Sequence, residues 1–365
     1  MKIMKILEVA NVSTKQVVDQ TIEILNAGGL VIFPTETTYG AGVDATNPRA
    51  VKKLLRYKSR REGKPLSIAV TSKQMAKKYV ELNDQAQKLY EQFLPGPITV
   101  VSKGKNKVAP GVESEFGTLG IRIPNHPLIL KLLRKFKKPI TATSANVSGK
   151  KRPYTINDIL KNISTKQKKL IDLVLDVGEL PVNPPSTVID TTLSSPTVFR
   201  HGSTHASTKS SKNQTTNYQS KNVKETMSIA GKLCLKHWDK IKTTGLLIGL
   251  NGSLGAGKTI FAKGVAQFLQ IRETITSPTY SFIEEYGYNR HGFKGKFFHL
   301  DVWKVGSEEE FQKLKVKDML QRKNVIVIEW WDQVAGWTDN VLPDLVINLE
   351  EKSSGQRNLK VITRL

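Results

Sequence analysis

The sequence has a single cysteine, no long apolar run and few acidic residues for its length. Cys234 stands alone among 365 residues, which excludes an internal disulfide and a cluster of cysteine metal ligands, and fits a reducing compartment. No apolar run approaches the roughly 18–20 residues of a membrane-spanning helix, and the amino-terminal stretch lacks the apolar core and cleavage site of a signal peptide. We therefore predict a cytoplasmic protein without membrane contact.

Acidic side chains are scarce: 32 Asp and Glu stand against 56 Lys and Arg, a formal net charge of +24. Most of the excess lies in residues 1–203, which hold 32 basic and 16 acidic side chains. A positive surface attracts RNA or anionic substrates, but 43 of the cations are Lys, which is equally typical of a solvated surface. Composition leaves both interpretations open.

Residues 204–223 differ in composition from the chain on either side. They are rich in Ser, Thr, Asn and Lys and almost without aliphatic side chains, so we predict a flexible linker between domains at 1–203 and 224–365. In both domains strand-like apolar runs alternate with helix-like segments, which predicts an α/β fold. The expected strands cover residues 29–33, 66–70, 98–101, 119–123, 140–143, 173–175, 187–189, 246–250, 297–300 and 325–328, and the expected helices cover 48–57, 128–133, 224–236 and 258–269.

The most specific pattern is GSLGAGKT at residues 252–259, placed between an apolar strand and a helix. This is the phosphate-binding loop of P-loop nucleotide hydrolases, in which backbone amides and a helix amino terminus bind phosphate oxygens. Lys258 would reach the outer phosphates, and the Thr259 hydroxyl would ligate Mg²⁺. The expected nucleotide-binding residues here are Gly252, Gly255, Ala256, Gly257, Lys258 and Thr259.

Two acidic residues end apolar strands in the same domain. Glu329 follows NVIVI, and we expect it to be the acid on the metal side. Asp301 ends FFHLD, with His299 on the same face of the strand, and for this histidine a buried structural role has more weight than a catalytic one.

The order LGAGKT, SPTY, HLD and EW resembles the TsaE family, the ATPase subunit of bacterial tRNA threonylcarbamoyl-adenosine synthesis, over essentially residues 224–365. The resemblance implies that Thr226 contacts the nucleotide, that Thr259 and Glu329 bind Mg²⁺ and that Asp301 supports ATP hydrolysis. It also implies a threonylcarbamoyl transferase and its accessory subunit as partners. The sequence departs from the family at Ser253, Trp303 and Lys315, which concerns the docking of partners.

The first domain carries polar patterns after a predicted helix and a predicted strand: KSRR at 58–61 and SANVSG at 144–149. In an extended segment Lys58 and Arg60 would point to the same side and could bind phosphate or carboxylate, although such a cluster also fits a solvated face. A site of Lys, Arg, Ser and Asn without an obvious base suits positioning of an anionic substrate and charge stabilisation in phosphoryl or adenylyl transfer.

Seven patterns in order, FPTETTYG, KSR, LPGPIT, GIRIPNHP, TSANVSG, PSTVID and FRHG, resemble the threonylcarbamoyl-AMP synthase family, the YrdC-like or TsaC domain, over about residues 10–203. The resemblance implies an open twisted α/β sheet and the synthesis of threonylcarbamoyl-AMP and pyrophosphate from L-threonine, bicarbonate and ATP. It implies Lys58 and Arg60 as catalytic residues, Thr37, Arg122, Ser144 and Ser186 on the threonine and bicarbonate side, and Lys58, Arg60, Lys64, Asn146 and Arg200 at the nucleotide.

Together the two resemblances predict a bifunctional chain that uses ATP and Mg²⁺, with tRNA as the end substrate of its pathway. Two alternatives stay open from the sequence. One is a basic RNA-binding domain coupled to a regulatory P-loop ATPase without adenylate chemistry, and the other is a small-molecule kinase, which lacks a visible lid and acceptor site. Whether tRNA touches this chain directly is open as well.

Overall fold

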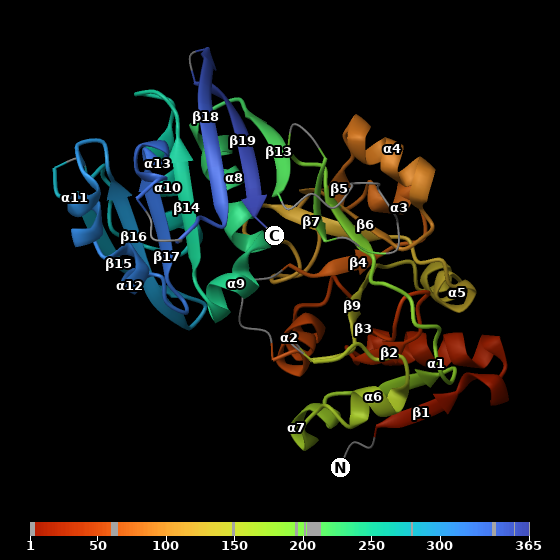
Figure 1. Ribbon diagram of the computed structural model, residues 1–365. Helices are drawn as coiled ribbons and strands as arrows, with labels where there is room; N and C mark the ends of the chain where they lie inside the picture. Colours follow the sequence, from red (N-terminus) through yellow and green to blue (C-terminus); the bar gives the residue numbers. More distant parts are fainter. Residues whose placement is uncertain are drawn as a thin grey trace. The chain divides into compact units, whose positions relative to one another are not determined.

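The computed structural model describes residues 4–59, 65–147, 150–193, 196–200, 202, 213–278, 280–337, 341–353 and 355–364. The chain folds into two compact units (Figure 1). The first consists of Met1–Thr192 and Pro196–Ser207, and the second of Leu193–Ser195 and Thr208–Leu365. Both units mix strands and helices, which confirms the predicted α/β class.

The first unit holds two sheets, with strand orders β1-β10-β2-β3-β9 and β12-β11-β6-β7-β4-β8, and with β5 paired to β6. The pairs β1 with β10, β10 with β2, β11 with β6 and β4 with β7 are parallel, and the other pairs are antiparallel. The elements are β1 (Lys5–Glu8), η1 (Val9–Asn11), α1 (Thr14–Asn26), β2 (Val31–Phe33), β3 (Gly40–Gly42), α2 (Pro48–Tyr57), β4 (Ser67–Ala69), α3 (Lys73–Ala76), β5 (Val80–Glu81), α4 (Asp84–Phe93), β6 (Ile98–Gly104), β7 (Thr118–Arg122), α5 (Pro127–Phe136), β8 (Ile140–Thr141), β9 (Thr143–Ser144), α6 (Ile156–Leu160), α7 (Thr165–Lys168), β10 (Leu173–Asp176), β11 (Thr187–Asp190) and β12 (Thr197–Arg200).

The second unit has one seven-stranded sheet of order β13-β19-β18-β14-β17-β16-β15. β18, β14, β17 and β16 are parallel, and antiparallel strands extend both edges. The elements are β13 (Asn213–Ser220), α8 (Val223–Lys236), α9 (Trp238–Thr243), β14 (Leu246–Asn251), α10 (Lys258–Phe268), β15 (Ile283–Arg290), β16 (Phe293–Asp301), α11 (Glu308–Lys313), α12 (Val316–Met319), β17 (Val325–Glu329), α13 (Trp331–Val334), β18 (Leu345–Ser353) and β19 (Gln356–Arg364).

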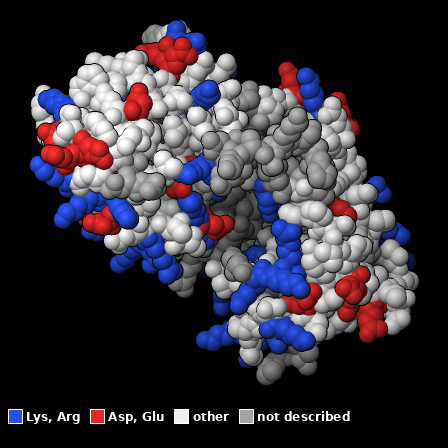
Figure 2. Space-filling view, in the orientation of Figure 1, with Lys and Arg blue, Asp and Glu red and all other residues white. Residues whose placement is uncertain are grey.

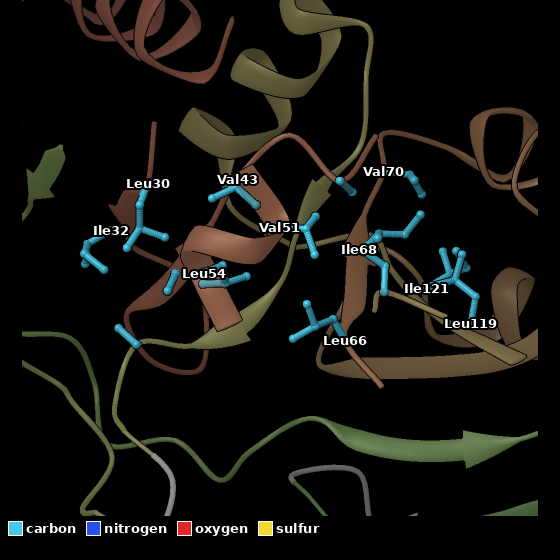
Figure 3. Packing of buried hydrophobic residues seen from close by; sticks show 14 of the residues in the cluster. Leu30, Ile32, Val43, Val51, Leu54, Leu66, Ile68, Val70, Leu119 and Ile121 are labelled. Atoms are coloured by element: carbon cyan, nitrogen blue, oxygen red, sulfur yellow. The ribbon is translucent and has the colours of Figure 1, made fainter. Parts of the chain in front are cut away.

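The larger core of the first unit is built from aliphatic side chains of α2 and of strands from both sheets (Figure 3). α2 starts with Pro48 at its first position and is capped by the side chain of Asn47. Its Val51 and Leu54 are fully buried, each contributing roughly 1.5–3 kcal/mol through burial. This packing fixes the carboxyl end of the helix, and with it Lys58.

Helices cover the central strands of the second sheet. α8 and α10 pack against each other, and Gly264 permits the close approach because a Cβ atom there would lie 2.6 Å from the Met227 Cα. On β14, Gly249 permits a similarly close approach of the Trp331 ring from α13, because a Cβ atom there would lie 2.5 Å from Trp331 Cγ. The apolar cluster around Trp331 includes Phe298 and Leu300 of β16. Among the described residues, no helix is both long and apolar enough to cross a membrane.

The flexible linker predicted at 204–223 is wrong in its second half. β13 pairs antiparallel with β19 from Asn213↔Arg364 to Ser220↔Arg357. Its side chains are nearly all polar, and Tyr218 is the large buried one, so backbone hydrogen bonds rather than aliphatic burial hold the strand at the edge of the sheet. The composition signal therefore missed it. The rest of the predicted linker, apart from residues 221–223, lies outside the described residues.

Candidate functional site

The predicted phosphate loop connects β14 to α10, which begins at Lys258. Gly252 and Gly257 have φ angles of 144° and 104°, which L side chains rarely adopt. A Cβ atom at Gly252 would lie 2.4 Å from the Leu349 carbonyl oxygen, and one at Gly257 would lie 2.5 Å from Arg357 Nε. Both positions therefore require glycine, and the loop has the tight course that phosphate-binding loops need.

The Lys258 ammonium lies at this loop. Its Nζ donates hydrogen bonds to the carbonyl oxygens of Gly252 at 2.7 Å and Ser253 at 2.9 Å, and it lies 3.4 Å from the centroid of the Trp330 ring. Burial lowers the pKa of Lys258, although nearby carboxylates, Glu329 first among them, oppose the shift. A cation held by main-chain carbonyls and a ring face can exchange these contacts for phosphate oxygens.

The two predicted acids meet across the parallel strands β16 and β17, whose register places Asp301 opposite Glu329. Glu329 Oε2 accepts a hydrogen bond from Thr259 Oγ1 at 3.2 Å, and its Oε1 lies 2.7 Å from Nε2 of the fully buried His299. Asp301 Oδ2 accepts a hydrogen bond from Ser277 Oγ at 2.9 Å. The structure thus brings Thr259, Glu329 and Asp301 together at the carboxyl ends of two strands.

Three further predicted nucleotide contacts differ in their surroundings. Gly255 lies in the loop with open space around its Cβ position, and Ala256 is fully buried beneath it. Thr226 is buried in α8, where its hydroxyl lies 2.7 Å from Ser220 Oγ and donates to the Asn222 carbonyl at 3.3 Å. Gly255 and Ala256 therefore belong to the loop, whereas the Thr226 hydroxyl is engaged at the start of α8.

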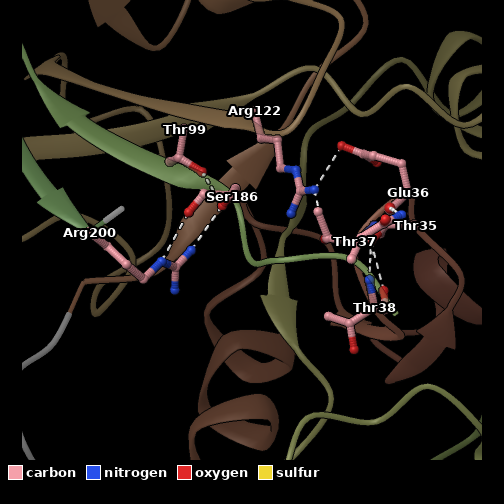
Figure 4. Close-up of polar contacts among 9 residues, drawn as sticks. Thr35, Glu36, Thr37, Thr38, Thr99, Arg122, Ser186 and Arg200 are labelled. Atoms are coloured by element: carbon pink, nitrogen blue, oxygen red, sulfur yellow. Dashed lines mark hydrogen bonds and ion pairs between the residues drawn. The ribbon is translucent and has the colours of Figure 1, made fainter. Parts of the chain in front are cut away.

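The first unit gathers its predicted residues around Arg122 at the end of β7 (Figure 4). Arg122 Nη2 donates to Glu36 Oε1 at 2.8 Å and to Thr37 Oγ1 at 2.9 Å, and Thr37 Oγ1 lies 3.1 Å from Thr35 Oγ1. The Arg122 and Glu36 side chains are only 11% and 17% exposed, so their charges interact in a medium less polar than water. This fixes the plane of the guanidinium.

Arg200 and Ser186 lie beside this group (Figure 4). Arg200 donates from Nη2 to Ser186 Oγ at 2.8 Å and from Nε to the Ser186 carbonyl at 3.0 Å, and Ser186 Oγ is 3.1 Å from Thr99 Oγ1. Desolvation, then the positive charges of Arg122 and Arg152, lowers the pKa of Arg200 to about 10. The positive charges of Arg122 and Arg152 near Arg200 would favour a bound anion.

The expected extended segment at Lys58 and Arg60 is wrong at its start. α2 ends at Tyr57, and Lys58 is its C-cap, with a right-handed helical backbone rather than an extended one; Ser59 has a φ of 49°. The buried Lys58 ammonium donates to the Ser144 carbonyl at 2.6 Å and to the Asn146 carbonyl, so the Lys and Ser-x-Asn patterns do meet. Arg60 and Lys64 lie outside the described residues.

A small pocket lies at this group of residues. It is bounded by Arg122, by the hydroxyl-bearing segments 35–38 and 143–144, and by apolar side chains. Its lining residues are Phe33, Thr35, Thr38, Gly40, Ala69, Arg122, Pro124, Ala142, Thr143 and Ser144. Of the predicted substrate residues, Arg122 and Ser144 line the pocket and Thr37 accepts a hydrogen bond from Arg122, whereas Ser186 and its partner Arg200 are not among the lining residues.

Sequence reasoning missed several polar residues at both sites. Glu36 stands inside the FPTETTYG pattern, so that pattern could have identified it, whereas Arg152 and Arg357 carry no signal in their neighbours. No group of three or more His, Cys, Asp or Glu in the described part of the chain could hold a metal. A Mg²⁺ ion at Thr259 and Glu329 would therefore need phosphate oxygens as well, which is how protein sites usually bind it.

Comparison with known proteins agrees with this division of the chain. The family model described as Telomere recombination, for Sua5, YciO and YrdC proteins, matches residues 23–202. The model described as Threonylcarbamoyl adenosine biosynthesis protein TsaE matches residues 220–359.

Relatives and a solved structure resemble the chain to different extents. A Methanocaldococcus jannaschii protein named "Putative threonylcarbamoyl-AMP synthase" is 41% identical over 52% of this chain and 86% of its own length. The Threonylcarbamoyl-AMP synthase of Pyrococcus abyssi is 35% identical over 49% of this chain and 52% of its own, so the match spans about half of that relative. A solved variant of Pyrococcus abyssi Sua5 shares the fold, with a TM-score of 0.51 at 21% identity over 90% of this chain and 91% of its own.

Proposed function

The chain belongs to the Sua5, YciO and YrdC family of threonylcarbamoyl-AMP synthases, joined to a TsaE domain, and from this premise we propose that it carries out two reactions of tRNA threonylcarbamoyl-adenosine biosynthesis. The first unit forms threonylcarbamoyl-AMP from L-threonine, bicarbonate and ATP. The second unit hydrolyses ATP in support of a threonylcarbamoyl transferase and its accessory subunit, which act on tRNA in the cytoplasm.

The first reaction has two balanced steps. The threonine amine and bicarbonate condense to a carbamate with loss of water, and a carbamate oxygen then attacks the α-phosphorus of ATP, so that the bond to the β-phosphate breaks and pyrophosphate leaves. Negative charge concentrates on the phosphates during this attack. Lys58, Arg60 and Arg200 would stabilise that charge, while Thr37, Arg122, Ser144 and Ser186 would hold threonine and bicarbonate, with Lys64 and Asn146 at the nucleotide.

The observation that carries this proposal is the convergence of cations with one acid. Arg122 forms an ion pair with Glu36 at 2.8 Å, Arg200 donates to Ser186 Oγ at 2.8 Å, and desolvation first, then the charges of Arg122 and Arg152, lowers the pKa of Arg200. A surplus of positive charge at a small pocket suits three substrates that bring a triphosphate, bicarbonate and a carboxylate. The comparisons do not favour the alternative of an RNA-binding protein without adenylate chemistry.

In the second unit, the contacts support nucleotide hydrolysis. Lys258 would exchange its carbonyl partners for the outer phosphates, and Asp301 and Glu329 would orient and activate water. The Thr259 hydroxyl and Glu329 carboxylate, 3.2 Å apart, are the oxygen ligands that would hold Mg²⁺, which when bound neutralises phosphate charge.

A pyrophosphate assay tests the first activity. Release of pyrophosphate from ATP should require both L-threonine and bicarbonate, and Arg122→Gln should lower it by about 10²-fold, as expected for loss of a charged group from an electrostatic site. Arg134→Gln, an exposed arginine on α5, is the matched control and should keep the parent rate. Release that continues without threonine would refute the proposal.

Formation of ADP tests the second activity separately. Lys258→Ala and Glu329→Ala should each abolish hydrolysis of ATP to ADP while pyrophosphate release by the first unit continues. ADP formation that survives both substitutions would show that the phosphate loop is not the site of hydrolysis.

A further inference from the structure

A second pocket of the ATPase unit lies away from the phosphate loop. It lies between β15, β16 and the segment around α12 and is widely open to solvent. Five cations line it, Lys294, Lys296, Lys315, Arg322 and Lys323, and we call it the β16 basic pocket. In Figure 2, Lys and Arg side chains gather at this end of the unit, at the lower left of the view.

The pocket lies at the amino ends of the parallel strands, whereas the nucleotide site lies at their carboxyl ends. Lys294 and Lys296 stand at the amino end of β16, whereas Asp301 ends that strand, and Lys323 comes shortly before β17, which ends in Glu329. At about 3.3 Å per residue, the five-residue β17 places its amino and carboxyl ends roughly 13 Å apart. The proposed hydrolysis therefore uses none of these cations.

The charges of the pocket are mostly unneutralised. Its lining contains only two acids, Glu285 and Asp318, and Glu285 pairs with Lys296 at 2.7 Å. Within the described part of the chain, neither Lys294 nor Lys315 has a carboxylate partner. Both side chains are exposed. The pocket thus presents a positive field to solvent.

The backbone gives an independent indication. Lys315 and Lys323 have φ angles of 51° and 74°, in the left-handed region where glycine costs least. A lysine in this conformation strains the backbone, and strained residues concentrate at functional sites. Two of the five cations of this pocket adopt the left-handed conformation. A lysine would be retained there if its ammonium group has a role that glycine cannot fill.

We propose that the β16 basic pocket binds the phosphate backbone of RNA, an inference that rests on the proposed function because tRNA is the end substrate of that pathway. A docked protein segment would need apolar anchors, but the apolar side chains of the lining are Phe298, which is buried, and Met319. The amide of Gln321 donates to the Asp318 carbonyl. What remains toward solvent is a set of point charges, which contact phosphates by releasing counterions and read no base.

Fluorescence anisotropy of a labelled tRNA transcript with the full chain, at several KCl concentrations and without ATP or threonine, tests this inference. Lys294→Glu/Arg322→Glu should weaken binding at least tenfold and reduce the slope of log affinity against log salt by about 0.7–0.9 for each phosphate that the variant no longer neutralises. Lys221→Glu/Lys360→Glu makes the same change of net charge at exposed positions elsewhere in the unit and should weaken binding less than threefold. Equal losses of affinity in the two double variants would overturn the proposal.

Lys315→Gly separates charge from folding. Because glycine relieves the left-handed strain, the variant should unfold at a higher temperature than the parent and yet bind the transcript several-fold more weakly. Unchanged RNA affinity in this variant and in Lys294→Glu/Arg322→Glu would overturn the proposal. All these variants should keep the parent rates of ADP formation and pyrophosphate release, so a failure of the proposed activities would be seen separately.

Discussion

The side chain of Arg357 on β19 packs against Gly257 of the phosphate loop, so closely that a Cβ atom at Gly257 would lie 2.5 Å from Arg357 Nε. Its Nε donates to the Ala256 carbonyl at 3.1 Å, and Nη1 donates to the Gly355 carbonyl at 3.0 Å, while the side chain is almost entirely buried. A strand remote in sequence therefore supports the loop that would hold the phosphates, and it places a cation beneath them.

Replacement of Gly257 by alanine should stop nucleotide binding. The new Cβ would collide with Arg357 and would also strain the positive φ, so we expect ATP hydrolysis to fall at least 100-fold. Gly255→Ala is the matched control, because it carries a similar strain at φ 82° but has open space around its Cβ, and it should lose less activity. Measurement of ADP formation compares the two, and Gly257→Ala/Arg357→Ala should regain part of the activity if the collision is the cause.

His299 should position Glu329 for hydrolysis. Replacement by Gln removes the 2.7 Å contact inside a fully buried site, so we expect the kcat of ADP formation to fall about tenfold with little change in KM, and the free energy of unfolding to fall by about 1–3 kcal/mol. His291→Gln, at an exposed histidine that contacts Gln270, should change neither. An unchanged kcat in His299→Gln would show that the histidine has a structural role alone.

Glu36 should set the affinity of the first unit for threonine by orienting Arg122. Glu36→Gln keeps the shape but removes the charge from a pair that is mostly shielded from water, so we expect the KM for threonine in pyrophosphate release to rise several-fold. Glu91→Gln changes an exposed glutamate paired with Lys73, where solvent weakens the interaction, and should leave this KM unchanged. Equal KM values for the two variants would contradict a role for Glu36 in orienting Arg122.

The stability of the second unit should depend on pH through His237. Burial lowers the pKa of His237 to about 4, below its ordinary value of 6.5, so the folded state resists protonation. The neutral His237 side chain contributes fully to the free energy of unfolding above pH 6.5. This contribution is lost as the pH falls toward 4, and the loss amounts to about 3 kcal/mol. All five tryptophans lie in this unit, so urea unfolding followed by their fluorescence measures it in the full chain. The loss of stability from pH 7 to 4 should be smaller in His237→Gln, and identical pH profiles would contradict the assignment.

The sequence was sufficient for elements whose signal is local. Each predicted helix and strand has a counterpart, because apolar spacing, caps and glycines act within a few residues; the strand expected at 140–143 is divided into β8 and β9 around Ala142. The phosphate loop is the same kind of case, since Gly252 and Lys258 belong to one short segment. Local signals also located Glu329 and Asp301 at strand ends.

The remainder of both sites depends on pairing across the chain. Arg122 and Glu36 are 86 residues apart, and Arg200 and Ser186 meet only because β11 and β12 pair. Arg357 approaches the phosphate loop through the order of strands in the sheet, which no neighbouring residue encodes. The end of α2 at Tyr57 was predicted correctly, but the helical backbone of its C-cap Lys58 was not, because the sequence pattern does not specify the conformation of the residue that follows a helix.

The place of β13 in the second sheet determines where the ATPase unit can be cut from the rest of the chain. A fragment that starts at residue 224 would lack the strand that covers β19, and it would also lose the Ser220 hydroxyl that contacts Thr226. An uncovered β19 would expose the backbone donors and acceptors of the alternate residues that face β13, along a nine-residue strand, which invites edge-to-edge aggregation. Recombinant fragments of this unit should therefore begin before Asn213. In shorter fragments we expect aggregation to appear before any loss of ATP hydrolysis.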